Sequence, residues 1–399
     1  MSDLPPLPTG FQAAGLHCGI KKNPDIFDLC LFSSDRPASL AGVFTQNKVC
    51  GAPVKVSRER VPRGTGRAVI INSGNSNACT GERGNEDARW MTAQTAAALG
   101  CEVDDVVVCS TGVIGRFLPK DVLEKGIPLV ARQLAATPEA FSNAARGMMT
   151  TDTFAKQTTR TVDLAGTTVR ISAAAKGAAM IGPNMATMLG VVMTDAALSP
   201  EEADAMLRHS VNRSFNCISV EGHTSTSDTV FLFANGAAGH AALDDTSRAA
   251  LQSAIDDVTM EMAQAIIRDA EGADHFITID VCGARTRDEA HRIAKAIADG
   301  PLVKTAITGA DPNWGRIVSA AGYSGVELQE EDVSLWLNEV LIYKDGAPCS
   351  FDTKALSQSI RDNRDVSIRM QLAHGDAEVR FWTSDLTAEY VRLNSDYTT

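Results

Sequence analysis

The chain has 399 residues, of which 44% are hydrophobic and 22% are charged, a composition typical of a globular protein with one large core or two smaller ones. With 49 acidic and 37 basic residues, its formal net charge of −12 argues against binding to nucleic acid or to an anionic membrane. Small-molecule chemistry is the expected kind of function.

The nine cysteines are scattered and never spaced as CxxC, a pattern typical of reduced cytosolic thiols rather than of a disulfide framework or a zinc site. The N-terminal sequence MSDLPPLPTGFQAAG lacks the basic and apolar segments of a secretory signal. No run reaches the ~18 apolar residues that a membrane-spanning helix needs. We therefore expect a soluble, cytoplasmic protein.

In the first half of the chain, β-branched residues mark strands and capping residues mark helices. The first predicted helix ends at Gly100, because glycine readily takes the left-handed conformation that closes a helix. The elements predicted here are a strand at 67–72, a helix at 85–100, a strand at 105–110, a helix from Thr137-Pro138, and a hairpin of strands 158–164 and 167–175 joined by Ala165-Gly166.

The second half of the chain also mixes helices and strands. Ser199 and Glu202 form a capping box, and Thr286 and Glu289 repeat the pattern. The elements predicted here are helices at 200–211, 247–272 and 287–300 and strands at 229–236, 275–281 and 333–343. Because no regular βαβ rhythm appears, we predict an α/β (α+β) fold of stacked mixed β-sheets covered by helices.

Several polar motifs adjoin these elements. In STGVIGR (110–116), the Thr111 hydroxyl and the Gly112 N–H could hold an oxyanion, although an ordinary tight turn also fits the motif. MTTDTFAK (149–156) is either a polar wall for a substrate or a capped turn. The Gly-rich loops 71–81 and 308–316 lie beside apolar segments, where sites are commonly built.

The seven histidines form neither HExxH nor a Ser-His-Asp order, so we do not expect a histidine base. The apolar stretch KGAAMIGPNMATMLG (176–190) offers another base. If the Thr187 hydroxyl attacks the carbonyl of Ala186 and the chain breaks there, the new α-amine of Thr187, with an ordinary pKa of about 7.7–8.0, can activate that hydroxyl. From the residues alone, the alternative is a buried threonine hydrogen-bonded to a neighbouring carbonyl, which is the commoner case.

The same stretch closely resembles KGxGMIxPNMATML, the self-processing signature of the ornithine acetyltransferase family, the ArgJ-like glutamate N-acetyltransferases of arginine biosynthesis. Further resemblances keep the family's order along nearly the whole chain; they are GVFTQNKVCGAPV (42–54), INSGNSNACTG (71–81), STGVIG (110–115), MTTDTFAK, SFNCISVEGHTSTSDTVFLFANG (214–236), DAEGA (269–273), LVKTAITGADPNWGRI (302–317) and YVRLNSDYTT (390–399).

This resemblance implies self-cleavage between Ala186 and Thr187, giving an α segment (1–186) and a β segment (187–399) that share one catalytic unit. The implied fold is an αββα sandwich, with two αβ pairs forming a heterotetramer. The implied reaction is ping-pong acetyl transfer from N2-acetyl-L-ornithine to L-glutamate through acetyl-Thr187. Acetyl-CoA is a possible further acetyl donor, and no metal or tightly bound cofactor is expected.

The resemblance also assigns site residues. Thr111 and Gly112 match the family's oxyanion hole. The substrate-binding positions are Thr150, Lys176, Thr187, Glu271, Asn394 and Thr399. We expect Lys176 to meet a carboxylate, and Glu271 to meet an amine or to shuttle a proton.

Two departures from the family pattern lie near these positions. Ala178-Ala179 replaces a small-Gly pair, which adds a Cβ where the loop needs unusual φ angles, so self-cleavage is expected to be slower. Asp274-His275 replaces a Thr-Lys pair and should alter the charge near Glu271. The alternatives to the acetyltransferase are a self-cleaved amidohydrolase or aminopeptidase, in which water is the acceptor, and an uncleaved ligand-binding protein.

Overall fold

The computed structural model describes residues 4–182 and 188–396. Its first group of strands is β1 (Phe11–Leu16), β2 (Leu29–Phe44), β3 (Arg63–Asn75), β4 (Val106–Val113), β5 (Lys156–Leu164), β6 (Thr167–Lys176), β7 (Leu189–Thr194) and β9 (Thr229–Ala234). The second group is β8 (Ile218–Ser219), β10 (Phe276–Ala284), β11 (Ser334–Leu337), β12 (Val340–Lys344), β13 (Ala347–Pro348), β14 (Asp365–Gln371) and β15 (Ala377–Ser384).

The helices are interspersed with these strands along the chain, and the last helix follows the last strand. They are α1 (Ala52–Arg58), α2 (Gly81–Leu99), α3 (Lys120–Arg132), α4 (Pro138–Met148), α5 (Pro200–Val211), α6 (Asp245–Arg268), α7 (Arg287–Asp299), α8 (Pro301–Thr308), α9 (Trp314–Gly322), α10 (Thr353–Asp362) and α11 (Ala388–Asp396). Short 3-10 turns occupy Val103–Asp105, Phe215–Cys217 and Glu330–Asp332.

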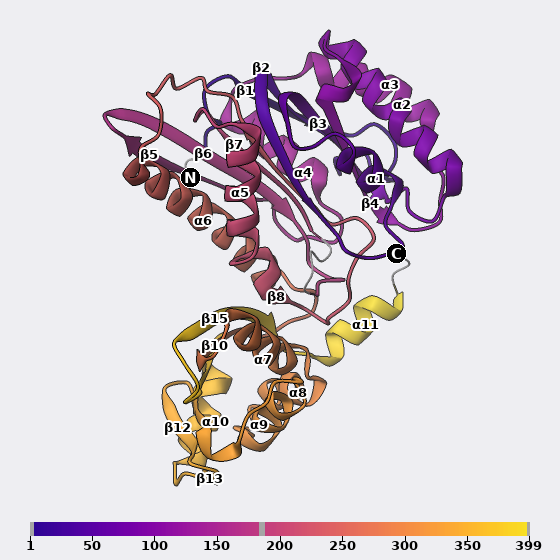
Figure 1. Ribbon diagram of the computed structural model, residues 1–399. Helices are drawn as coiled ribbons and strands as arrows, with labels where there is room; N and C mark the ends of the chain where they lie inside the picture. Colours follow the sequence, from indigo (N-terminus) through magenta and orange to yellow (C-terminus); the bar gives the residue numbers. More distant parts are fainter. Residues whose placement is uncertain (1–3, 183–187, 397–399) are drawn as a thin grey trace.

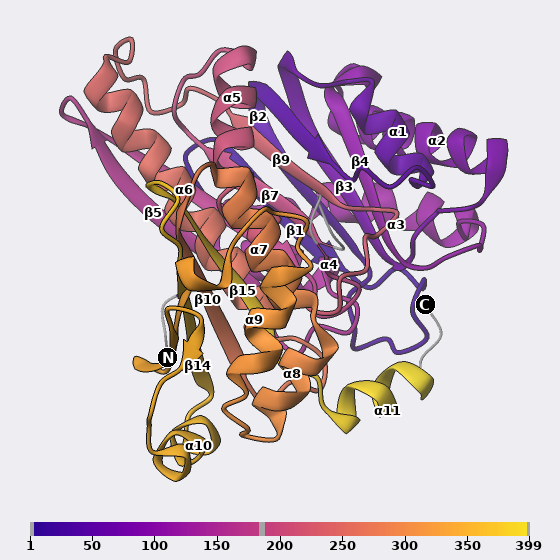
Figure 2. The same cartoon turned by 60° about the horizontal axis from the view of Figure 1, so that its bottom comes forward.

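The strands form two mixed sheets. The larger has the order β4-β3-β2-β9-β7-β6-β5, with β1 paired to β2, and the smaller has the order β13-β12-β11-β14-β10-β15-β8. Figure 1 shows the larger sheet with α1 to α6 as one body, the smaller sheet with its own helices as a second, and α11 running back toward the first. Figure 2 shows α7, α8 and α9 in front of the smaller sheet. The predicted class of mixed sheets covered by helices is confirmed.

The larger sheet joins chain segments from both sides of position 186. Strands β9 and β7 lie next to each other between β2 and β6. Gly42 of β2 pairs with Phe231 of β9, and Lys176 of β6 pairs with Leu189 of β7. Backbone hydrogen bonds and a shared core therefore hold the two segments together.

Buried apolar side chains fill both faces of this sheet. On one face, Phe32 of β2 meets Phe141 of α4 edge to face, with ring centroids 6.3 Å apart. On the other face, Val192 and Leu232 join a cluster with α5 and α6 that continues into the smaller sheet. Alternating residues along β7 and β9 thus serve opposite faces, as the period of a strand requires.

The capped helices form as predicted. Ser199 and Glu202 make both hydrogen bonds of a capping box, and Thr286 accepts a hydrogen bond from the Glu289 N–H. Gly100 closes α2 in the left-handed conformation. The hairpin β5–β6 turns at Ala165 and Gly166, both with positive φ.

The prediction of one continuous strand at 333–343 is wrong. The segment is a hairpin of β11 and β12, whose turn residues Asn338 and Glu339 have φ of 45° and 64°. Asparagine tolerates this left-handed conformation, and the Ser367 N–H donates to the Asn338 side chain at 2.9 Å. The sequence shows apolar residues on both sides of the turn, so the two strands look like one continuous strand.

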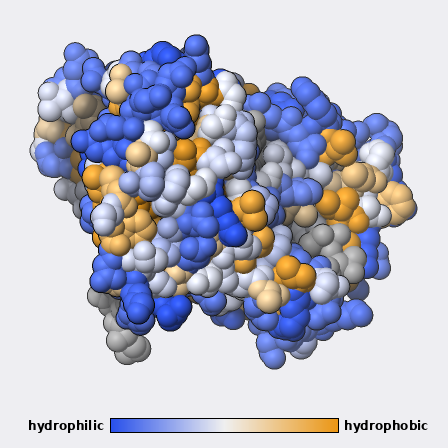
Figure 3. Space-filling model, turned by 90° about the horizontal axis from the view of Figure 1, so that it is seen from below, coloured by the Kyte–Doolittle hydropathy of each residue, from blue (hydrophilic) through white to orange (hydrophobic). Residues whose placement is uncertain are grey.

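All nine cysteines are free. Within residues 4–182 and 188–396, no helix is long and apolar enough to span a membrane. On the face seen in Figure 3, apolar side chains form separate groups among hydrophilic ones.

A buried ion pair links the start of β10 to the end of β15. His275 Nδ1 lies 2.8 Å from Asp385 Oδ2, and His275 Nε2 lies 3.1 Å from the Ile360 carbonyl oxygen. Both partners are acceptors, so the imidazolium form fits best, and the hydrogen bond to Asp385 raises the pKa of His275. The positive charge of His275, expected from the sequence to act near Glu271, is therefore paired with Asp385.

We predict that this pair makes stability depend on pH. Because the folded protein holds the His275 proton more tightly than the unfolded chain, the stabilisation is complete below the ordinary histidine pKa of about 6.5 and is lost as the pH rises through the raised pKa. Chemical denaturation across this range should show wild type losing stability relative to His275→Gln as the pH rises. His291→Gln is the control, because burial lowers the pKa of His291 and the trend should reverse. A constant difference between wild type and His275→Gln would contradict the assignment.

Candidate active site

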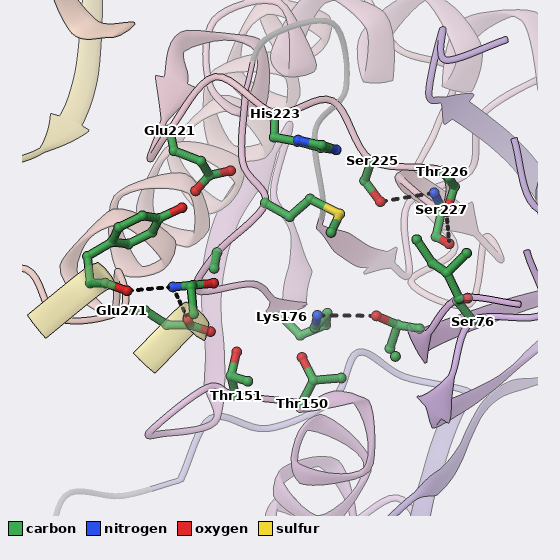
Figure 4. Close-up of a pocket in the computed structure, with 17 residues that line it drawn as sticks. Ser76, Thr150, Thr151, Lys176, Glu221, His223, Ser225, Thr226, Ser227 and Glu271 are labelled. Carbon is green, nitrogen blue, oxygen red and sulfur yellow. Dashed lines mark hydrogen bonds between the residues drawn. The ribbon is translucent and has the colours of Figure 1, made fainter. Parts of the chain in front are cut away.

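A cavity of about 210 Å³ opens where the larger sheet, the smaller body and α11 meet. Its polar lining comes from widely separated parts of the chain. The lining residues are Ser76, Thr111, Gly112, Ile114, Thr150, Thr151, Lys176, Ala179, Met180, Glu221, His223, Ser225, Thr226, Ser227, Glu271, Tyr390 and Asn394. Figure 4 shows the carboxylates of Glu221 and Glu271 on one side, Ser76 and Ser225 to Ser227 on the other, and Lys176 between them.

Thr111 and Gly112 reach the cavity at the end of β4. Gly112 pairs with Gly74 of the neighbouring β3 and has φ of 129°. A Cβ at Gly112 would lie 2.4 Å from the Gly74 carbonyl carbon, so the close approach of these two strands requires glycine here. Because no side chain fits at this position, only the backbone of Gly112 lines the cavity here.

Lys176, the last residue of β6, places a buried ammonium group in the cavity wall. Its Nζ donates to the Thr111 hydroxyl at 3.3 Å, and the side chain is almost completely buried. Burial lowers the pKa of Lys176, while the charge of Asp152 acts in the opposite direction. The site thus holds a cation whose cost of burial is offset by a nearby carboxylate.

Asp152 is the centre of a buried charge network behind the cavity. Its Oδ1 accepts from Lys156 Nζ at 2.7 Å and from the Gly177 N–H at 2.7 Å. Lys156 Nζ also donates to Asp269, at 2.5 Å. Burial alone would raise the pKa of Asp152, but Lys176, Lys156 and the Gly177 N–H together lower it to about 2. Asp152 is therefore ionised near neutral pH; it bonds directly to Lys156 and the Gly177 N–H, and its charge favours the charged form of Lys176.

The opposite end of the cavity is acidic. Asn394 Nδ2 of α11 donates to Glu271 Oε2 at 3.1 Å, so the C-terminal helix is attached to the site. The Ile181 N–H donates to Glu221 Oε1 at 2.6 Å, whereas Glu221 Oε2 is buried and has no hydrogen-bond partner among the described residues. Burial raises the pKa of Glu221 to about 7 and that of Tyr390 to about 12.

A further buried carboxylate lies where β7 begins. The Met188 N–H donates to Asp228 Oδ1 at 3.0 Å. Burial raises the pKa of Asp228 well above its ordinary value, and the Met188 N–H and Lys176 act in the opposite direction. Since Met188 directly follows Thr187 in the sequence, Asp228 anchors the described chain beside the predicted cleavage position.

Six of the nine predicted site residues line this cavity. They are Thr111, Gly112, Thr150, Lys176, Glu271 and Asn394. The other three, Ala186, Thr187 and Thr399, lie outside the described residues, and the roles of all nine stay predictions. Ala178-Ala179 lies beside the cavity, where the Glu271 N–H donates to the Ala178 carbonyl at 3.0 Å.

Three carboxylates around the site, Glu221, Asp152 and Asp228, were not predicted from the sequence as site residues, although Asp152 lies in the polar motif MTTDTFAK. One signal was present, because the segment 219–229 interrupts two apolar strands with a run of hydroxyl and acidic residues. The Gly-rich loops gave mixed results: loop 71–81 contributes Ser76, while loop 308–316 belongs to the smaller body. Within the described parts of the chain, no group of three or more His, Cys, Asp or Glu residues could hold a metal ion.

Comparison with known proteins places this chain in a family of enzymes. Residues 12–399 match the sequence model of the ArgJ family. The arginine biosynthesis bifunctional protein ArgJ of Rhodopirellula baltica is 44% identical over 398 residues, covering 98% of this chain and 96% of that protein. The protein of the same name from Geobacter sulfurreducens is also 44% identical, covering 98% and 99%.

A solved structure of ornithine acetyltransferase from Mycobacterium tuberculosis, complexed with ornithine, is 37% identical with a TM-score of 0.40. The match covers 44% of this chain and 92% of the ornithine acetyltransferase chain. The family match and the identity over nearly full length show that this chain belongs to the ArgJ family. The resemblance noted in the sequence is therefore confirmed.

We predict that the close approach at Gly112 is essential for the site's framework. Gly112→Ala should lower the free energy of unfolding by about 1–3 kcal/mol more than Gly115→Ala does, because overpacking has this typical cost. Gly115 is a matched control: it also has positive φ, at 78°, but its added Cβ would meet nothing within 4 Å. Chemical denaturation of both variants measures the difference. Equal destabilisation would mean that backbone strain, and not the contact with Gly74, sets the requirement.

Proposed function

We propose that this protein transfers the acetyl group of N2-acetyl-L-ornithine to L-glutamate through an acetyl-Thr187 intermediate, after self-cleavage between Ala186 and Thr187. The single observation that carries the proposal is the gathering of Thr111, Gly112, Lys176 and Glu271 around one cavity. These residues come from motifs that resemble the family's, in a chain that belongs to that family.

The proposed reaction has two balanced halves. In the first, the Thr187 Oγ attacks the acetyl carbonyl of N2-acetylornithine, its proton passes to the α-amine of Thr187, and that proton then goes to the departing nitrogen of ornithine. In the second, the amino nitrogen of glutamate attacks the acetyl ester, N-acetylglutamate forms, and Thr187 regains its hydroxyl proton. No metal or bound cofactor takes part in either half.

The cavity provides groups suited to these steps. The Thr111 hydroxyl and the Gly112 N–H are the proposed donors to the oxyanion that develops in each half. Lys176 is proposed to bind a substrate carboxylate, since it is a buried cation with only one hydrogen bond to another side chain among the described residues. Glu271, Asn394 and Thr150 are proposed to bind the remaining polar groups, with Thr399 added from the C-terminus.

The pairing of the larger sheet supports cleavage without separation of the segments. The ladders β2–β9 and β6–β7 both cross the boundary between 1–186 and 187–399. The cleaved chains would therefore stay together as one αβ unit, and we propose that two such units form a heterotetramer. Activity with acetyl-CoA as donor is a separate proposal, which an assay with glutamate and acetyl-CoA alone tests.

We predict that Thr187→Ala abolishes both cleavage and acetyl transfer. A denaturing gel of wild type should show two bands near half of 42.3 kDa, and Thr187→Ala should show one band at the full mass. Thr187→Ser is the control, because it keeps a hydroxyl and should still cleave. A single full-length band from active wild-type protein would contradict the proposal, and would favour an uncleaved protein.

We predict that Thr111→Val lowers kcat for acetyl transfer by about 10²–10³-fold, the typical cost of losing one oxyanion donor. Thr151→Val lines the same cavity and serves as the control for loss of a hydroxyl there, with an expected change below about tenfold. The assay follows formation of ornithine in the presence and absence of glutamate. Release of ornithine at the same rate without glutamate would favour a hydrolase.

A further inference from the structure

One atom of the cavity lacks the hydrogen bond that its burial calls for. Glu221 follows β8, and its Oε1 is held by the Ile181 N–H at 2.6 Å. Its Oε2 is buried without a partner among the described residues and belongs to a side chain that lines the cavity. Since a buried carboxylate oxygen left unpaired is costly, Oε2 has unused capacity to accept or share a hydrogen bond with a ligand that enters this end of the cavity.

The other carboxylate at this end already has a hydrogen-bond donor on one of its oxygens. Glu271 Oε2 accepts from Asn394 Nδ2 at 3.1 Å, and the Glu271 backbone is fixed by the Ala178 carbonyl. Both acids are thus attached to the 176–182 segment, but only Glu221 offers an unpaired buried oxygen. Figure 4 shows the two carboxylates on the same side of the cavity, away from Ser76.

The proposed substrates place opposite charges at the ends of their side chains. Near neutral pH, an alkyl ammonium such as that of ornithine is protonated and the side-chain carboxyl of glutamate is ionised. If both amino acids use one site in turn, the same subsite must accept a cation in one half of the reaction and an anion in the other. A carboxylate of fixed charge would favour the first substrate and repel the second.

We propose that Glu221 is the residue that reads the side-chain end of both substrates, as a carboxylate for the ammonium of N2-acetylornithine and as a protonated acid that donates to the carboxylate of glutamate. This inference rests on the proposed function. Between the two halves Glu221 takes up one proton from solvent, and it returns that proton when N-acetylglutamate leaves, so protons balance over the cycle.

The surroundings of Glu221 suit such a change of state. Burial raises the pKa of Glu221 to about 7, so both forms are accessible near neutral pH. The backbone N–H groups of Ile181 and Met180 and the buried Lys304 of α8 act to lower its pKa. Glu271, three residues after α6, acts to raise it, and Tyr390 of α11 also faces it. His223 lines the same cavity. The Ile181 N–H holds Oε1 in either protonation state, because it needs only an acceptor.

Calorimetric titration of the cleaved wild-type enzyme tests the inference without a variant. Near the pKa of Glu221, binding of glutamate should take up more protons than binding of ornithine, by a difference approaching one proton per site. Titrations in buffers of different ionisation enthalpy give this number. Comparing the two ligands cancels the α-amine that they share. Equal proton uptake for both would overturn the inference.

Steady-state kinetics of Glu221→Gln provides the second test. Glutamine keeps an acceptor for the Ile181 N–H but cannot carry charge. Above the pKa of Glu221, this variant should raise KM for N2-acetylornithine about tenfold and lower KM for glutamate, and below that pKa both ratios to wild type should approach one. Glu221→Asp keeps an ionisable carboxyl, so its KM values for N2-acetylornithine and for glutamate should still change with pH in opposite directions. Glu261→Gln, which removes a half-exposed carboxylate paired with Arg160, is the control and should change neither KM.

The outcomes separate two failures. If wild type transfers acetyl to glutamate but Glu221→Gln shifts both KM values equally or without pH dependence, the role of Glu221 is wrong and the proposed function stands. If wild type transfers no acetyl group between the two amino acids, the proposed function fails, and this inference fails with it.

Discussion

The buried charge network of Asp152, Lys156 and Asp269, with Lys176 close to it, is the constraint on which the rest of the site depends. Burying an ionised group in a protein costs several kcal/mol unless an opposite charge and hydrogen bonds compensate, and removing one partner of a buried pair typically costs about 3–5 kcal/mol. Here Lys156 forms ion pairs with both Asp152 and Asp269, and the charge of Asp152 also acts on Lys176. The start of β5, the 149–153 loop and the end of α6 are therefore held together by ion pairs, and the Gly177 N–H links the end of β6 to Asp152.

This network also explains why the cavity needs both bodies of the protein. Asp269 ends α6, and two residues later Glu271 enters the cavity beside Asn394 of α11. The segment after β8 brings Glu221 from the edge of the smaller sheet. One end of the cavity is thus built on the strands of the larger sheet and the other end on the smaller body, which gives the site a basic centre and an acidic end.

Much of the local structure follows from the sequence, because caps and turns are local. Ser199, Thr286 and Gly100 define helix ends through hydrogen bonds or φ angles that involve only near neighbours. The turn at Asn338 was missed, because its conformation is favoured by a contact with Ser367, far along the chain. The network around Asp152 was missed for the same reason, since Lys156 and Asp269 are 113 residues apart in sequence.

The site was predicted only in part, and mainly through resemblance. Physical reasoning identified Thr111, Gly112 and Thr187 as chemically suited residues but could not exclude ordinary turns or a buried threonine. Lys176, Glu271 and Asn394 needed the family resemblance, since nothing in their local sequence says that they meet. Glu221 needed the structure, because an unpaired buried oxygen is a property of the folded site alone.

The most direct test of the account is a mass spectrum of the enzyme after incubation with N2-acetylornithine in the absence of glutamate. The account predicts two chains, 1–186 and 187–399, with one acetyl group on Thr187 of the second chain that disappears when glutamate is added. Acetyl transfer to glutamate by an enzyme whose 187–399 chain never carries that acetyl group, or whose chain is still intact at position 186, would contradict it.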